Sequence, residues 1–183
     1  MHRPASIAVF GSSEPGEGAP LYEQARRVGA LLASAGHRVV TGGYGGVMDG
    51  ASRGAVESGG EALGVVCDVF VGRPASRHLT ETVTTPDLFE RTRALVDRSD
   101  GFVVLHGKSG TLAELAWLWA LHRAGCLGRR PVVLIGGGYR PLLRQLVESG
   151  MIESEQFDVT RVVDSPEEAL EVLEGFLAQV REG

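Results

Sequence analysis

The sequence contains no asparagine, one lysine and two cysteines among its 183 residues. The cysteines, Cys67 and Cys126, lack metal-binding spacing and are too few for a disulfide framework. Both have apolar sequence neighbours, and we expect them to be small buried residues. No metal site is indicated, and no cofactor is expected. The missing asparagine hints at a heat-adapted source. The single lysine, Lys108, against 17 arginines lacks the lysine enrichment of such sources, so a bias in the base composition of the gene explains the pattern as well.

Long apolar runs are absent too. No stretch approaches the roughly 20 apolar residues that a membrane helix needs. The first residues lead straight into a strand-like segment without a secretory pattern. We therefore expect a cytoplasmic protein with no membrane partner. The net charge of −5 argues against broad electrostatic binding to nucleic acid.

Glycine, by contrast, is abundant, with 26 residues, many of them clustered between apolar runs and helical patterns. The expected strands are 6–11, 37–41, 62–67, 81–84, 102–105, 131–135 and 159–163. The expected helices are 21–35, 47–58, 87–98, 111–124, 139–149 and one that begins at Pro166. This alternation predicts βαβ units in a doubly wound, mostly parallel α/β sheet, a Rossmann-like fold with helices on both faces. No linker or repeat interrupts it, so residues 1–183 are expected to form one domain. The segment 68–86 has no clear period and is expected to wrap over the top of the sheet.

Four small-residue loops follow the expected strands, at the edge where such sheets bind ligands. They are 11–13, 41–46, 106–111 and 136–138. Glycine lets the backbone approach an anion closely, and a helix that starts after the loop supplies free N–H groups. The loop 106–111 (HGKSGT) is the best example, although it matches neither the Walker A nor the dinucleotide motif. Taken alone, it fits a phosphate site and a simple tight turn equally well.

Two of these segments together resemble the LOG family of nucleotide phosphoribohydrolases. The segment 41–51 (TGGYGGVMDGA) is similar to the family's GGG-x-x-GLM loop, and 106–114 (HGKSGTLAE) is similar to its PGG-x-GT-x-x-E loop. Weaker matches cover most of the chain, at 10–13 (FGSS), 59–65 (GGEALGV), 88–91 (LFER) and 164–168 (DSPEE).

The resemblance implies a homodimeric enzyme that cleaves the N-glycosidic bond of a nucleoside 5′-monophosphate. The products would be a free base and ribose 5-phosphate; in plants and bacteria the family releases cytokinins in this way. The family's catalytic arginine and glutamate correspond to Arg91 and Glu114. The corresponding phosphate- or nucleotide-binding residues are Gly11, Ser12, Ser13, Gly42, Gly43, Gly45, Gly46, Met48, Gly107, Lys108, Ser109, Gly110 and Thr111.

Each of these assignments has a structural alternative. Thr111 and Glu114 have the spacing of a capping box, in which the glutamate only bonds back to the start of its helix. Arg91 could be a solvated arginine on a helix surface. Lys108 could hold a phosphate as a point charge or be an exposed loop residue. The apolar segment 115–121 (LAWLWAL) suits a helix buried in the core and in a dimer interface.

The sequence also departs from the family's motifs. The PGG tripeptide is replaced by HGK at 106–108, RK by RT at 91–92, and GLMG by GVMD at 46–49. These changes leave two hypotheses open, a hydrolase that uses Glu114 and Arg91 and a non-catalytic module that binds a nucleotide or a phosphorylated cofactor. A lysine decarboxylase, the family's older label, is rejected because no lysine lies in a setting that suits a cofactor.

Overall fold

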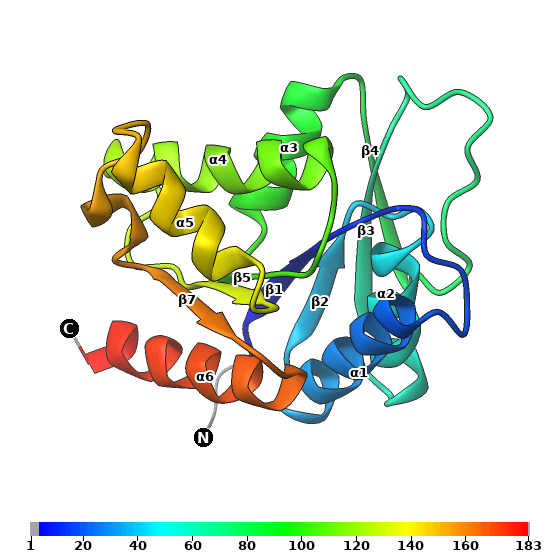
Figure 1. The fold of residues 1–183 in the computed structure, drawn as a ribbon. Helices are drawn as coiled ribbons and strands as arrows, with labels where there is room; N and C mark the ends of the chain where they lie inside the picture. The colour runs from blue at the N-terminus through cyan, green and yellow to red at the C-terminus, as the bar shows by residue number, and fades with distance from the viewer. Residues whose placement is uncertain (1–3, 183) are drawn as a thin grey trace.

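The computed structural model describes residues 4–182 and is built on a seven-stranded sheet in which every paired strand is parallel. The strand order is β4-β3-β2-β1-β5-β6-β7. The strands are β1 (Ser6–Phe10), β2 (Arg38–Thr41), β3 (Ala62–Cys67), β4 (Glu81–Thr85), β5 (Gly101–Val104), β6 (Val132–Ile135) and β7 (Thr160–Val163). The helices are α1 (Pro20–Ser34), α2 (Val47–Glu57), α3 (Leu88–Asp97), α4 (Ser109–Arg123), α5 (Tyr139–Glu148), α6 (Pro166–Glu182) and the short 3₁₀ helix η1 (Ser154–Phe157). Helices α1, α2 and α6 cover one face and α3, α4 and α5 the other (Figure 1), which confirms the predicted doubly wound Rossmann-like fold.

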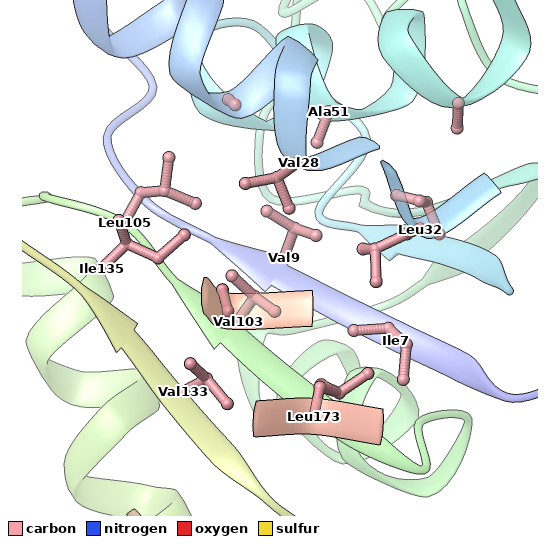
Figure 2. Packing of buried hydrophobic residues seen from close by; sticks show 14 of the residues in the cluster. Ile7, Val9, Val28, Leu32, Ala51, Val103, Leu105, Val133, Ile135 and Leu173 are labelled. Atoms are coloured by element: carbon pink, nitrogen blue, oxygen red, sulfur yellow. The ribbon is translucent and has the colours of Figure 1, made fainter. Parts of the chain in front are cut away.

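Each face of the sheet has its own buried apolar core, because successive side chains of a strand point to opposite faces. Ile7 and Val9 of β1 pack with α1, α2 and α6, whereas Ala8 and Phe10 pack with the helices of the opposite face. Figure 2 shows the first of these cores, in which Leu173 of α6 lies near Ile7. The strands read as continuous apolar runs in the sequence because both of their faces are covered.

The strand order reverses at β1. The chain moves outward from β1 through β2, β3 and β4, then returns to place β5 on the other side of β1. The loops that leave β1 and β5 therefore diverge, which opens the crevice where sheets of this kind bind ligands. A hydrogen bond from the Ser12 N–H to the His106 carbonyl oxygen, with an N···O distance of 3.1 Å, still joins the two loops at their base.

The starts of two helices bear directly on the crevice. Asp87 caps α3 as predicted, and its Oδ1 accepts hydrogen bonds from the N–H groups of Phe89 and Glu90, both at 2.8 Å. Helix α4 starts at Ser109, so the prediction that it starts at Thr111 is wrong. Serine and glycine at 109 and 110 suggest a loop, but they form the first turn of the helix.

Several side chains on the outer face of α4 and in the turn after it are more exposed than expected. Cys67 is buried as predicted, but Cys126 is exposed in the turn after α4, so that prediction is wrong. Trp119 is buried, and its Nε1 donates to Thr160 Oγ1 at 3.1 Å. Trp117, two residues earlier on α4, is 49% exposed.

Within residues 4–182, no helix is long and apolar enough to cross a membrane.

Candidate active site

A cavity of about 200 Å³ lies at the carboxyl ends of the central strands. Residues of the β1 loop, the glycine loop after β2, the connection between β3 and β4, helix α3 and the start of α4 line it. The lining residues are Val9, Phe10, Gly11, Ser12, Ser13, Glu14, Gly42, Tyr44, Met48, Phe70, Arg73, Arg91, Lys108, Gly110, Thr111 and Glu114. The cavity thus collects residues from five segments that are far apart in the sequence.

Two glycines of the loop after β2 are required by close packing. Gly46 has a φ of 74°, and a Cβ placed on it would lie 2.3 Å from the Ser12 carbonyl oxygen. That closeness lets the Val47 N–H donate to the same oxygen at 2.8 Å, which ties the start of α2 to the β1 loop. A Cβ on Gly42 would lie 1.8 Å from Arg91 Nη2. The lack of a side chain at residue 42 therefore makes the space in which the arginine lies.

The first turn of α4 presents unpaired amides next to the cavity. The first N–H to bond within this region is that of Leu112, which donates to the Lys108 carbonyl oxygen at 3.0 Å. In the described part of the chain, the N–H groups of Ser109, Gly110 and Thr111 have no acceptor. Together with the partial positive charge of a helix start, such amides form an anion site. Gly110 and Thr111 also line the cavity itself.

Arg91 reaches the cavity from the first turn of α3 and is not the solvated surface residue that was considered. Its Nε donates to the Val65 carbonyl oxygen at 2.9 Å, and its Nη2 donates to the Gly42 carbonyl oxygen at 3.0 Å. Nη1 makes no hydrogen bond within residues 4–182. The guanidinium is therefore fixed by the backbone of β3 and of the loop after β2, and it keeps donors for a ligand.

Glu114 lies one helical turn after Thr111 and faces the same cavity. In the described residues its carboxylate makes no hydrogen bond or ion pair, and the capping-box alternative is wrong because the helix is capped at Lys108. Burial raises the pKa of Glu114 to about 7, and the positive charge of Arg91 offsets this only in part. A half-buried carboxylic acid that titrates near neutrality beside a cavity is characteristic of catalytic sites.

Lys108 lies at the mouth of the cavity, where its Nζ pairs with Glu14 Oε1 of the β1 loop at 2.6 Å. Both side chains are largely exposed. The pair spans the two loops that diverge at the reversal of strand order. The side chain of His106, the first residue of the same loop, does not line the cavity.

Sequence reasoning missed six of the lining residues, of which Val9, Phe10 and Glu14 flank the predicted β1 loop and three belong to other segments. Tyr44, Phe70 and Arg73 all line the cavity. Tyr44 lies inside the glycine loop 41–46, so its place in a predicted binding loop could have marked it as a site residue. Phe70 and Arg73 belong to the connection between β3 and β4, where no periodic pattern gave a signal.

The structure places most of the predicted site residues around one cavity. Those that line it are Gly11, Ser12, Ser13, Gly42, Met48, Arg91, Lys108, Gly110, Thr111 and Glu114. Those that do not line it are Gly43, Gly45, Gly46 and Gly107, which lie in the adjoining loops, and Ser109, the first residue of α4. Within residues 4–182, no group of three or more histidine, cysteine, aspartate or glutamate side chains is placed to hold a metal.

Known proteins share this arrangement of sequence and fold. The family model described as "Possible lysine decarboxylase" matches residues 48–173. A protein of Mycobacterium tuberculosis named cytokinin riboside 5′-monophosphate phosphoribohydrolase is 33% identical over 174 residues, which cover 90% of this chain and 91% of that protein. A protein of the same name from Rhodococcoides fascians is 31% identical, with 86% of this chain and 81% of that protein covered.

Solved structures extend the likeness to the fold. The molybdenum cofactor binding protein of Rippkaea orientalis superposes with a TM-score of 0.74 at 26% identity, with 97% of this chain and 99% of that chain covered. The family match covers residues 48–173, which include the cavity residues of α3 and α4, and the bacterial relatives cover 86–90% of this chain. The chain therefore belongs to the LOG family, whose model carries the description "Possible lysine decarboxylase".

Proposed function

We propose that this protein hydrolyses the N-glycosidic bond of a nucleoside 5′-monophosphate and releases a free base and ribose 5-phosphate. One observation carries the proposal. The unpaired Glu114 carboxylate, the fixed Arg91 guanidinium and the free amides at the start of α4 surround the same cavity. The names of the bacterial relatives give the same reaction class.

Each of these groups has a separate role in the proposed reaction. Amides of the first turn of α4 hold the phosphate, and the positive charge of Arg91 acts on the Glu114 carboxylate and orients it. The bond between C1′ and the base breaks, and its electron pair leaves with the base. Ionised Glu114 stabilises the positive charge that develops on the ribose ring, and the oxygen of a water molecule then bonds to C1′. That water loses one proton and the departing base takes up one, so the products are the neutral base and ribose 5-phosphate. Ionisation of Glu114 near pH 7 makes this carboxylate available at neutral pH.

A chromatographic assay of released base tests the proposal. The substrates are AMP, GMP, CMP, IMP and prenylated AMP, and the expected result is base release from at least one of them. Glu114→Gln should abolish release, whereas Glu171→Gln, on the exposed face of α6, should leave it unchanged. If all five nucleotides stay intact, or if Glu114→Gln is as active as the unchanged protein, the proposal is wrong.

A second function, non-catalytic binding of a nucleotide or a phosphorylated cofactor, is favoured by one specific observation. Lys108, which replaces the last glycine of the family's PGG tripeptide, pairs with Glu14 across the mouth of the cavity. The likeness to a molybdenum cofactor binding protein supports the same idea. This function predicts that a ligand raises the melting temperature without any product being formed. A panel of nucleotides and pterin phosphates that gives no thermal shift would rule it out.

We also infer that two copies of the chain associate. Large apolar side chains are exposed on α3 and α4, on the same face of the sheet. They include Phe89, which is 87% exposed, and Trp117, which is 49% exposed. Leu88 and Leu112 are also partly exposed on these helices. Exposed apolar side chains of this size favour burial against a second copy. A monomeric mass in sedimentation equilibrium would remove this inference.

A further inference from the structure

We propose that Phe70 and Arg73 form the base-binding end of the cavity and so determine which nucleotides the protein accepts. Both residues lie on the connection between β3 and β4, residues 68–80, here called the arm (Figure 1). The inference rests on the proposed function, because it divides the same cavity into a phosphate end and a base end.

The arm packs against the ring of Tyr44, which is held in place by hydrogen bonds. Tyr44 is buried, and its hydroxyl both accepts from the Cys67 N–H at 2.8 Å and donates to the Cys67 carbonyl oxygen at 3.1 Å. The Phe70 ring meets the Tyr44 ring edge to face, with 5.3 Å between the ring centroids. This arrangement places an aromatic surface on the cavity wall at a defined position.

Two guanidinium groups lie against this aromatic pair. Arg73 Cζ is 5.7 Å from the centroid of Tyr44 and 5.4 Å from that of Phe70. Arg91 Cζ is 5.7 Å and 5.8 Å from the same two centroids. Arg91 is also bonded to two backbone carbonyl oxygens, whereas Arg73 forms no side-chain hydrogen bond or ion pair in the described part of the chain. Arg73 is therefore a cation held at the cavity edge with all of its donors free for a ligand.

The rest of the arm is anchored so that these two residues face the cavity. The Ser76 N–H donates to the Gly43 carbonyl oxygen at 2.8 Å, and Ser76 Oγ donates to Asp49 Oδ1 at 2.5 Å. Asp49 also interacts with His78 Nδ1 at 3.1 Å and accepts from the Tyr22 hydroxyl at 2.6 Å. One carboxylate on α2 thus holds two residues of the arm next to the glycine loop.

The position of the arm assigns it to the base and not to the phosphate. It leaves the end of β3, whereas the free amides follow β5, three strand positions away in the sheet. At about 4.8 Å per strand, the strand ends are roughly 14 Å apart. The flat ring of a nucleobase can stack on Phe70. The Arg73 guanidinium can donate hydrogen bonds to the acceptor atoms on the edge of the base. The chemical class expected at this end is therefore an aromatic base with hydrogen-bond acceptors on its edge.

Calorimetric binding of AMP, GMP and ribose 5-phosphate tests the assignment, because the last of these has the phosphate and sugar without a base. Arg73→Ala should weaken binding of the nucleotide by about tenfold. It should change binding of ribose 5-phosphate by less than about twofold, because the amides of α4 hold the phosphate. Arg73→Lys should restore only part of the loss, and Arg129→Ala, an exposed arginine remote from the cavity lining, is the control for charge.

Equal weakening of the nucleotide and ribose 5-phosphate would place Arg73 at the phosphate and overturn the assignment. An unchanged affinity of Arg73→Ala for every nucleotide that the wild-type chain binds would also overturn it. The same experiment distinguishes failure of the base-binding assignment from failure of the proposed hydrolysis. A wild-type chain that shows the expected split in binding but releases no base supports the base-binding end and contradicts the reaction.

Discussion

Replacing Glu114 with glutamine is expected to remove base release and, at the same time, to stabilise the fold at alkaline pH. Burial raises the pKa of this carboxyl group from its ordinary value of 4.5 to about 7, so the folded protein disfavours the ionised form. At about 1.4 kcal/mol for each pKa unit, the ionised carboxylate costs the folded state about 3 kcal/mol. Glutamine has nearly the same shape and carries no charge, so the substitution removes that cost.

The sign of the pH dependence follows from which state holds the proton more tightly. Folded Glu114 binds its proton more tightly than the unfolded chain does, so the wild-type protein loses stability as the pH rises from about 4.5 to about 7. Above pH 8 the loss is complete, and the glutamine variant should be about 3 kcal/mol more stable. At pH 5 the two proteins should differ by less than about 1 kcal/mol.

Urea unfolding followed by tryptophan fluorescence at pH 5, 7 and 8.5 measures this difference directly. For a chain of this size, 3 kcal/mol corresponds to a rise in melting temperature of roughly 6–12 °C. Glu171→Gln is the matched control, because that carboxylate is exposed on α6 and should give no such gain. A stability difference that is the same at every pH would refute the reasoning that burial in the folded protein raises the pKa of Glu114.

Three further changes test other parts of the site. Gly42→Ala should lower kcat by at least about tenfold with a smaller effect on stability, because the new methyl group would displace the Arg91 guanidinium; steady-state kinetics with normal turnover would contradict this. Glu14→Gln releases Lys108 from its ion pair and should tighten phosphate binding about threefold at low salt, an effect that should shrink in a titration at high salt. Asp87→Ala removes the cap of α3 and should cost about 1 kcal/mol of unfolding free energy in urea; an unchanged midpoint would show that the two cap bonds contribute nothing.

Much of the fold could be predicted from the sequence because parallel strands leave a simple pattern. Buried on both faces, strands such as Val132–Ile135 appear as short apolar runs between helical periods, and all seven predicted strands are present. The start of α4 was placed two residues late. Ser109 and Gly110 are weak helix formers, and it is their position after β5 that allows them to start the helix.

The part of the candidate site that could be predicted is the part whose residues lie close together in the sequence. Glu114 and the amides of the first turn of α4 lie within a few residues of one another, so one motif contains them both. The arm could not be predicted in this way. Ser76 and His78 are placed by Asp49, which lies 27 and 29 residues earlier in the chain, and no local pattern encodes such contacts. Cys126 is exposed although its sequence neighbours are apolar, because it lies in the turn after α4, and the apolar character of neighbours does not predict which side of a turn faces the core.

The free amides at the start of α4 have a consequence for how occupancy of the cavity can be observed. An N–H without an acceptor exchanges its hydrogen with solvent rapidly, and an anion that accepts from it slows the exchange. Ser109, Gly110 and Thr111 should therefore show deuterium uptake that slows only when a phosphate is bound. These three positions report ligand occupancy whether or not the bound molecule is ever cleaved.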